Sequence, residues 1–309
     1  MLKKLLVNFW SNKNFGWRMA RILALLGVGL AGYLMLFEDS FIYFPSKYPE
    51  GIWQRGESRA REGEIVAGVE DVQLTASDGV RLHGWFCTPQ VVRGGGAGAA
   101  RTLEPVKTRR TLLFLHGNAG NLSHRYDIID ELVKLPVNVF IIDYRGYGKS
   151  EGRPSEQGLY ADARAAWDYL TTVRGIPPAS IVLFGESLGG AVAIDLASKV
   201  QACGLIVQSS FTSIADMAAE VMPLAPRFLI RTKMDSLSKI AHVSCPKLFI
   251  HSEADDVIPY RLGRRLFDAA HAPKQFYEVK NAPHNLTFDI GGAAIYGALR
   301  DFINSSCGA

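Results

Sequence analysis

Residues Ile181 to Gly190 decide the fold, and they read Ile-Val-Leu-Phe-Gly-Glu-Ser-Leu-Gly-Gly. The first four residues are apolar and predict a buried strand, and an Ala/Val/Ile-rich stretch that predicts a helix follows the glycines. Between the two lies Gly-x-Ser-x-Gly, the pattern of a turn that raises a serine from the top of a sheet. The alternative is a plain strand–helix turn in which Ser187 caps the helix. Motifs elsewhere in the chain distinguish a nucleophile turn from a plain strand–helix turn.

The composition indicates one large globular domain with an additional N-terminal segment. The chain has 309 residues, of which 48% are hydrophobic and 21% are charged, so one α/β domain of about 250 residues would use most of it. The net charge is only +4. Because no basic patch is interleaved with aromatic residues, we expect no nucleic-acid partner.

The four cysteines do not form a metal-binding pattern. They show no Cys-x-x-Cys spacing and no zinc pattern with histidine, so we expect neither a metal nor an organic cofactor. Cys87, Cys203 and Cys245 lie in or beside apolar runs, which favours small buried side chains. A disulfide stays open at this point.

The N-terminal segment is typical of a membrane anchor. Basic residues within positions 1–18 precede an apolar run at 19–37, and aromatic residues flank the run on both sides. The positive-inside rule then predicts a cytoplasmic N-terminus and a catalytic domain on the non-cytoplasmic side. The alternatives are a buried helix and a cleaved signal peptide, with a small-residue cleavage site at 29–31.

A connector is expected at 38–64, and the main domain is expected at 65–309. Short apolar strands alternate with helical stretches through this domain, which predicts an α/β fold with a mostly parallel central sheet and helices on both faces. The segment 211–242 breaks the alternation with apolar residues and prolines. We interpret it as a small cap that lines an apolar pocket beside Ser187, although a kinked core helix is the alternative.

Two loops complete a candidate acyl-transfer site. Residues 116–121 follow the predicted strand at 111–115, where an enzyme of this architecture places a donor for the oxyanion hole. We therefore predict the backbone N–H groups of Asn118 and Leu188 as the two donors. The alternative for the first loop is a turn in which Asn121 or Ser123 caps the next helix.

The predicted acid and base follow later strands of the sheet. Asp255 lies just past the strand expected at 246–251, and His284 lies just past the strand expected at 275–279. Ligands of open α/β sheets bind at this edge. The chain order Ser187, Asp255, His284 is the order of a Ser–His–Asp triad on this fold. Asp256 stays open as the acid.

Several motifs together resemble the α/β-hydrolase fold family of serine hydrolases, and within it the membrane-anchored group typified by α/β-hydrolase domain-containing protein 13 and its bud-emergence-type relatives. The resemblance covers about residues 37–303 and implies Ser187 as nucleophile, Asp255 as acid and His284 as base. One departure is Ser252, where relatives often have glycine. The motifs that carry the resemblance are Leu115–Asn121, Asp143–Gly152, Gly158–Tyr160, Leu183–Ala193 and Pro283–Asn285.

These observations predict a membrane-anchored serine hydrolase that cleaves carboxylic esters or thioesters of lipid-like or acylated substrates through an acyl-enzyme. One alternative is a serine peptidase of the same fold. The other is a membrane-tethered binding module that keeps the fold without catalysis.

Overall fold

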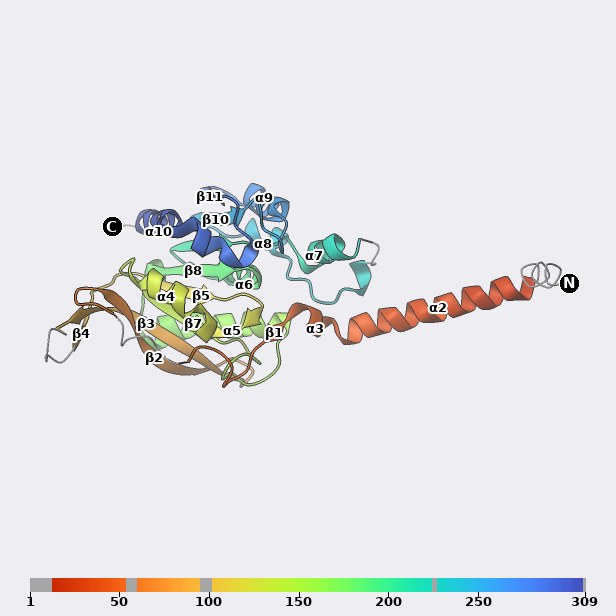
Figure 1. Cartoon of the computed structure of the whole chain (residues 1–309), viewed down its shortest axis with the longest axis horizontal. Coiled ribbons are helices and arrows are strands. Elements are labelled where there is room, and N and C mark those ends of the chain that lie inside the picture. Colours follow the sequence, from red (N-terminus) through yellow and green to blue (C-terminus); the bar gives the residue numbers. More distant parts are fainter. Residues whose placement is uncertain (1–12, 54–59, 95–101, 224–226, 308–309) are drawn as a thin grey trace.

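The computed structural model describes residues 13–53, 60–94, 102–223 and 227–307. Within these ranges, nine strands form the main sheet (Figure 1). They are β2 (Ile65–Thr75), β3 (Arg81–Arg93), β4 (Thr102–Pro105), β5 (Thr111–Leu115), β7 (Asn138–Ile142), β8 (Ile181–Glu186), β9 (Gly204–Gln208), β10 (Lys247–Ser252) and β11 (Lys274–Val279).

The strand order is β11–β10–β9–β8–β5–β7–β3–β2, with β4 paired to β3. The neighbours from β7 to β11 are parallel, whereas β2, β3 and β4 pair in antiparallel fashion and β3 joins β7 in the same way. The predicted mostly parallel sheet is therefore confirmed. Strand β8, which carries the Gly-x-Ser-x-Gly turn, lies in the interior of the sheet between β5 and β9.

Helices cover both faces of this sheet, as predicted. They are α4 (Tyr126–Val133), α5 (Glu156–Asp168), α6 (Leu188–Ala197), α8 (Ser236–Ile240), α9 (Tyr260–Ala269) and α10 (Thr287–Ser306), with the short turns η2 (Leu122–Arg125), η3 (Tyr169–Val173), η4 (Pro178–Ser180) and η6 (His284–Leu286). Side chains alternate across β5, so Leu113 and Leu115 pack in one core with residues of α5 and α6. Leu112 and Phe114 pack in the other core with residues of α4 and α10.

The segment that the sequence analysis assigns to a connector contacts the main domain closely. Helix α3 (Glu38–Ile42) is followed by β1 (Phe44–Pro45), which pairs with β6 (Ala119–Gly120) in a two-stranded parallel sheet. Tyr43 is buried in the core, and Asn121 donates from its side-chain amide to the carbonyls of Ser46 and Glu50. Residues 38–53 thus pack against the loop that follows β5.

Helix α2 (Lys13–Leu36) precedes this segment and projects from the domain (Figure 1). Its exposed apolar residues include Leu23, Leu25, Leu26 and Val28. Of the helices in the described ranges, none combines the length and apolarity needed to cross a membrane. The predicted span at 19–37 falls largely on α2, and residues 1–12 lie outside the described ranges.

The predicted cap at 211–242 has two parts with different environments. Its first part holds α7 (Ile214–Val221) and η5 (Arg227–Leu229), and no residue of α7 is fully buried. Its last part contains α8, which packs against α6 with Ile240 in the core. Residues of α7 and η5 line the cavity that opens at Ser187, whereas no residue of α8 does.

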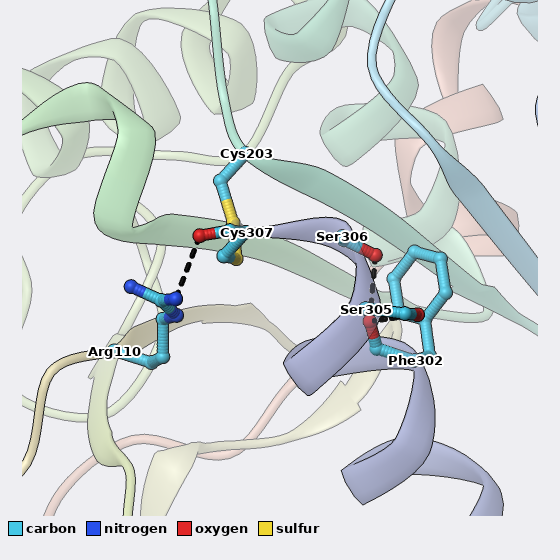
Figure 2. The surroundings of a disulfide bond; sticks show 6 residues. All are labelled: Arg110, Cys203, Phe302, Ser305, Ser306 and Cys307. Atoms are coloured by element: carbon cyan, nitrogen blue, oxygen red, sulfur yellow. Dashed lines mark hydrogen bonds between the residues drawn. A yellow bond between two sulfur atoms is a disulfide. The ribbon is translucent and has the colours of Figure 1, made fainter. Parts of the chain in front are cut away.

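A disulfide joins the C-terminal helix to the sheet. Cys203, directly before β9, pairs with Cys307 at the end of α10, and the side chain of Arg110 donates to the carbonyl of Cys307 at 2.6 Å (Figure 2). Cys203 is buried, as expected, but it is not a free thiol. Cys87 is buried, and Cys245 is a free, partly buried thiol.

Candidate active site

Ser187 lies in a strained turn between β8 and α6. Its φ of +55° and ψ of −117° are unfavourable for a residue with a side chain, so the surrounding contacts must hold it there. Its N–H donates to the carbonyl of Gln208 at 2.9 Å, and Ser210 donates from its hydroxyl to the carbonyl of Ser187 at 2.8 Å. A Cβ on Gly189 would overlap the carbonyl of Leu115, which explains the glycine at this position.

The structure brings the three residues of the predicted triad together. His284 lies with Nε2 3.1 Å from the Oγ of Ser187 and with Nδ1 2.8 Å from the Oδ2 of Asp255. The side chain of Asp255 is fully buried, and that of His284 is 9% exposed. The imidazole therefore bridges the serine and the carboxylate, in the geometry of a nucleophile, its base and the group that orients the base.

Asp255 is held as a carboxylate by several donors. The backbone N–H groups of Val257 and Ile258 donate to its Oδ1 at 3.0 and 2.7 Å, and the buried His251 lies with Nε2 3.3 Å from its Oδ2. Burial alone raises the pKa of Asp255, but hydrogen bonds from His251 and His284 outweigh burial and hold the pKa well below its usual range.

Asp256 has a different partner. Its Oδ1 accepts a hydrogen bond from the backbone N–H of His284 at 2.9 Å. The two adjacent aspartates, between which the sequence leaves the choice open, thus contact the same histidine at different points. Asp255 contacts the ring, and Asp256 contacts the main chain.

Ser252 and Glu253 also link two loops: the acid loop, which follows β10 and carries Asp255, and the histidine loop, which follows β11 and carries His284. The hydroxyl of Ser252 accepts from the N–H groups of Ala254 and Ala282 at 3.1 and 3.0 Å, and the carboxylate of Glu253 accepts from the N–H of Asn281 at 3.3 Å. Side chains of the acid loop therefore hold the backbone of the histidine loop. In the sequence, Ser252 stands out only as a departure from the family pattern. That departure is the one local feature that could have indicated the hydrogen bond from Ala282 to Ser252.

The two predicted oxyanion donors lie beside Ser187. Leu188 is the first residue of α6, and Asn118 lies in the loop after β5; both line the same cavity as Ser187. Asn118 is held by Phe44 and Tyr147, whose N–H and hydroxyl donate to its carbonyl at 2.9 and 2.8 Å. Within the described ranges, the N–H of Asn118 has no hydrogen-bond acceptor.

An ion pair that the sequence analysis missed connects these two segments. Arg125 donates from Nε to Oε2 of Glu186 at 3.1 Å and from Nη1 to the carbonyl of Ala119 at 3.2 Å. Glu186 precedes Ser187, and Ala119 follows Asn118. Arg125 therefore fixes the nucleophile turn relative to the oxyanion loop.

His116 is the first residue of the loop after β5, and it is fully buried. Its Nδ1 is 2.8 Å from the carbonyl of Gly117, while its Nε2 has no hydrogen-bond partner in the described part of the chain. Burial, followed by the positive charge of Arg125, lowers the pKa of His116 to about 4. His116 is thus a neutral structural group at neutral pH.

An apolar cavity of about 510 Å³ opens at Ser187. One face of α7 lines it with Ile214, Met217, Ala218 and Val221, which recur at helical spacing. The predicted cap therefore borders the site. Unexpectedly, Glu38, Phe41 and Ile42 of α3 also line this cavity, although the sequence analysis assigns them to a connector.

A second cavity of about 380 Å³ is more polar and borders His284, Glu186 and Arg125.

The described residues contain no group of three or more His, Cys, Asp or Glu side chains that could hold a metal ion.

Comparison with known proteins now identifies the family. The chain is 36% identical over 286 residues to the protein MT2364 of Mycobacterium tuberculosis, covering 92% of this chain and 94% of the relative. It is 33% identical to the α/β-hydrolase domain-containing protein WAV2 of Arabidopsis thaliana, covering 90% of this chain and 91% of the relative. The chain belongs to the α/β-hydrolase family. The protein bem46 of Schizosaccharomyces pombe is similar as well, with 33% identity and coverage of 88% and 87%.

Other comparisons agree with this α/β-hydrolase assignment. The family model described as serine aminopeptidase, S33, matches residues 106–239. The solved structure of the Pyrococcus furiosus esterase PF2001 superimposes with a TM-score of 0.64 at 19% identity, covering 86% of this chain and 98% of the esterase. At that identity the superposition shows the hydrolase fold alone.

Proposed function

We propose that this α/β-hydrolase is a serine hydrolase that cleaves carboxylic esters or thioesters of lipid-like or acylated substrates. The observation that carries the proposal is the unbroken contact from Ser187 through His284 to Asp255, at 3.1 and 2.8 Å, beside an apolar cavity. A scaffold protein would have no need for a strained serine, a bridging imidazole and a buried carboxylate at one point.

The first half of the reaction forms an acyl-enzyme. Ser187 Oγ bonds to the carbonyl carbon of the substrate while His284 Nε2 takes the hydroxyl proton. Asp255, whose pKa is held well below its usual range, accepts from Nδ1–H and stabilises the imidazolium. The N–H groups of Asn118 and Leu188 bind the oxyanion, each lowering the barrier by about 3 kcal/mol. The bond to the leaving oxygen or sulfur then breaks, and His284 returns the proton to that atom.

The second half releases the acid. A water molecule gives a proton to His284 and attacks the acyl carbon, and the tetrahedral intermediate collapses with transfer of that proton back to Ser187 Oγ. The products are a carboxylic acid and the regenerated serine. The polar cavity beside His284 supports departure of a polar leaving group on that side, since His284 protonates it.

The cavity supports a hydrocarbon acyl group. Its wall near Ser187 is made of apolar side chains of α7 and α3, which favour burial of an acyl chain by about 25 cal/mol per Å². We expect Met217→Trp to fill part of this cavity and lower hydrolysis of long acyl esters about ten-fold relative to short ones. If the parent hydrolysed short and long acyl esters at equal rates, this would argue against binding of the acyl chain in the cavity.

Attachment to a membrane through the N-terminal segment is part of the proposal. Basic residues at positions 3, 4, 13, 18 and 21 precede or open the apolar run, and the described apolar side chains of α2 are exposed. The Cys203–Cys307 disulfide supports a catalytic domain on the non-cytoplasmic side, because disulfides persist in oxidising compartments. A protease-protection assay on cells tests this topology.

One alternative is a peptidase, which the description of the matching family model favours. Kinetics on an ester and an amide with the same acyl group separate the two: a kcat/KM that is higher for the amide would favour the peptidase. The other alternative, a binding module without catalysis, would show no activity on either substrate.

A fluorophosphonate probe tests the central proposal, with the full chain in detergent. We expect the parent to be labelled, Ser187→Ala to be unlabelled and His284→Ala to react far more slowly. Ser198→Ala, at the end of α6 remote from Ser187, removes a serine hydroxyl that does not contact the nucleophile turn, so it is the matched control and should keep its labelling. No labelling of a folded parent would overturn the serine-hydrolase proposal.

A further inference from the structure

The mouth of the apolar cavity is itself apolar and exposed. Val221 and Met222 belong to the cavity wall, yet they are 78% and 44% exposed. Phe41, on the opposite element α3, lines the same cavity and is 55% exposed. A hydrocarbon chain could therefore pass from the surface toward Ser187 without crossing a polar rim.

The exposed apolar surface continues beyond the cavity. Phe228 of η5 does not line the cavity and is 82% exposed, while the next residue, Leu229, lies in the cavity wall. We call Phe41, Val221, Met222 and Phe228 the cap rim. Single exposed apolar residues are ordinary, but several at one cavity mouth indicate an interaction surface.

The cap rim is continuous with α2. The ring of Tyr33 on α2 lies 4.8 Å from that of Phe37 and 6.5 Å from that of Phe41. Helix α2 also contacts η5, and it leaves the domain at the end where α7 lies (Figure 1). The cavity mouth thus opens at the base of α2.

Glu38 holds these parts together. Its buried carboxylate accepts from Nε of Arg231 at 3.0 Å and from the N–H of Thr232 at 2.9 Å. Because Glu38 lies at the start of α3 and Arg231 follows η5, the cap is tied to the segment that begins right after α2. The orientation of the mouth relative to α2 is therefore built into the fold.

We propose that the cap rim is a membrane-contact surface, and that the bilayer presents acylated substrates directly to the cavity at Ser187. The inference rests on the proposed hydrolase function and adds the route by which the substrate arrives. The partner is a lipid surface because exposed apolar positions 22, 23, 25, 26 and 28 point to different sides of α2. A protein groove would cover one face of such a helix, whereas the acyl chains of a lipid surface can contact apolar side chains on several sides.

Phe228→Asp tests this surface without touching the cavity wall. One substrate is the short, water-soluble nitrophenyl acetate; the other is methylumbelliferyl palmitate within phosphatidylcholine vesicles. We expect Phe228→Asp to lower the vesicle rate at least about ten-fold, because a carboxylate opposes burial in lipid, and to leave the acetate rate within about two-fold. The loss should be overcome by raising the vesicle concentration.

Val173→Asp is the matched control. Val173 is 71% exposed and ends η3, the continuation of α5 that returns to the start of β8, at the opposite edge of the sheet from Ser187. Both rates should be kept by this variant. If Phe228→Asp keeps its vesicle rate, or loses both rates equally, the membrane-contact surface is overturned.

A second measurement does not depend on catalysis. An environment-sensitive nitrobenzoxadiazole label is attached through Phe228→Cys in a Ser187→Ala, Cys245→Ser chain, and vesicles are added. A blue shift of the label's fluorescence emission at Phe228→Cys, absent when the label is attached through Val173→Cys, supports the membrane-contact surface even if no ester is hydrolysed. No shift at either position overturns it, whereas failure of the parent on all esters overturns the hydrolase proposal instead.

Discussion

The carboxylate of Asp256 accepts a hydrogen bond at 2.9 Å from the backbone N–H of His284, the residue whose ring is bound by the neighbouring Asp255. Adjacent aspartates therefore hold one histidine from two sides. Asp255 controls the orientation and charge of the imidazole, and Asp256 controls the position of the main chain that carries it. The two carboxylates predict different consequences when each is neutralised.

Neutralising the two aspartates separates these roles. Asp255→Asn should lower kcat about 10³- to 10⁴-fold, because an amide cannot stabilise the imidazolium. Asp256→Asn keeps an oxygen that can accept from the N–H of His284, so it should cost at most about ten-fold. The measurement is kcat on a soluble ester together with the rate of fluorophosphonate labelling. A loss for Asp256→Asn as large as that for Asp255→Asn would contradict this division of roles.

Ser252 is expected to position the histidine loop. Ser252→Ala removes the acceptor for two backbone N–H groups, of which that of Ala282 is buried, and should lower the free energy of unfolding by about 1–3 kcal/mol. We also expect kcat to fall while KM changes little, since substrate does not contact Ser252. Ser198→Ala, which removes only a donor to the carbonyl of Asp195, is the control for denaturant unfolding. Unchanged stability and kcat would show that the hydroxyl is dispensable.

His116 predicts a pH dependence of stability. Its pKa in the folded state is lowered to about 4, below its ordinary value, so the unfolded chain binds the proton more readily. The folded state therefore loses stability as the pH falls from about 6.5 toward 4, by up to about 3 kcal/mol, and loses nothing above that range. His116→Met should flatten this part of the curve. Urea unfolding of both proteins at several pH values measures it, and parallel curves would contradict the assignment.

The Cys203–Cys307 disulfide predicts a redox-dependent stability without an effect on the site. It closes a loop with a sequence separation of 104, and its loss through Cys307→Ser should lower the free energy of unfolding by about 2–4 kcal/mol. The rate of probe labelling in the folded state should be unchanged, because the bond lies at the start of β9 rather than at its catalytic end. A reductant should lower the free energy of unfolding of the parent and of Cys245→Ser alike, and should leave that of Cys307→Ser unchanged.

Local sequence patterns predicted the features that depend on neighbours in the chain. The run from Ile181 to Gly190 specified a strand, a sharp turn and a helix, because burial, glycine and helix propensity act over a few residues. The same kind of pattern predicted that Asp255 and His284 follow strand ends. Since carboxyl ends of parallel strands meet at one edge, their proximity to Ser187 followed from the topology.

Contacts between distant segments could not be predicted in this way. Arg125 and Glu186 are separated by 61 positions, and nothing in the local pattern of either residue indicates the ion pair. Glu38 and Phe41 read as part of a connector, yet both border the apolar cavity, and Glu38 binds Arg231 of the cap, 193 positions later in the chain. Their roles depend on the path of the folded chain.

The sequence by itself thus determined the sheet, the nucleophile turn and the order of the candidate triad, because hydrophobic periodicity and turn chemistry are local. Tertiary structure alone decided which aspartate contacts the imidazole, that α3 forms one wall of the cavity, and that Cys203 pairs with Cys307. Each of these depends on the distance between atoms of remote residues. That distance is set only when the two cores close around the sheet and bring those segments together.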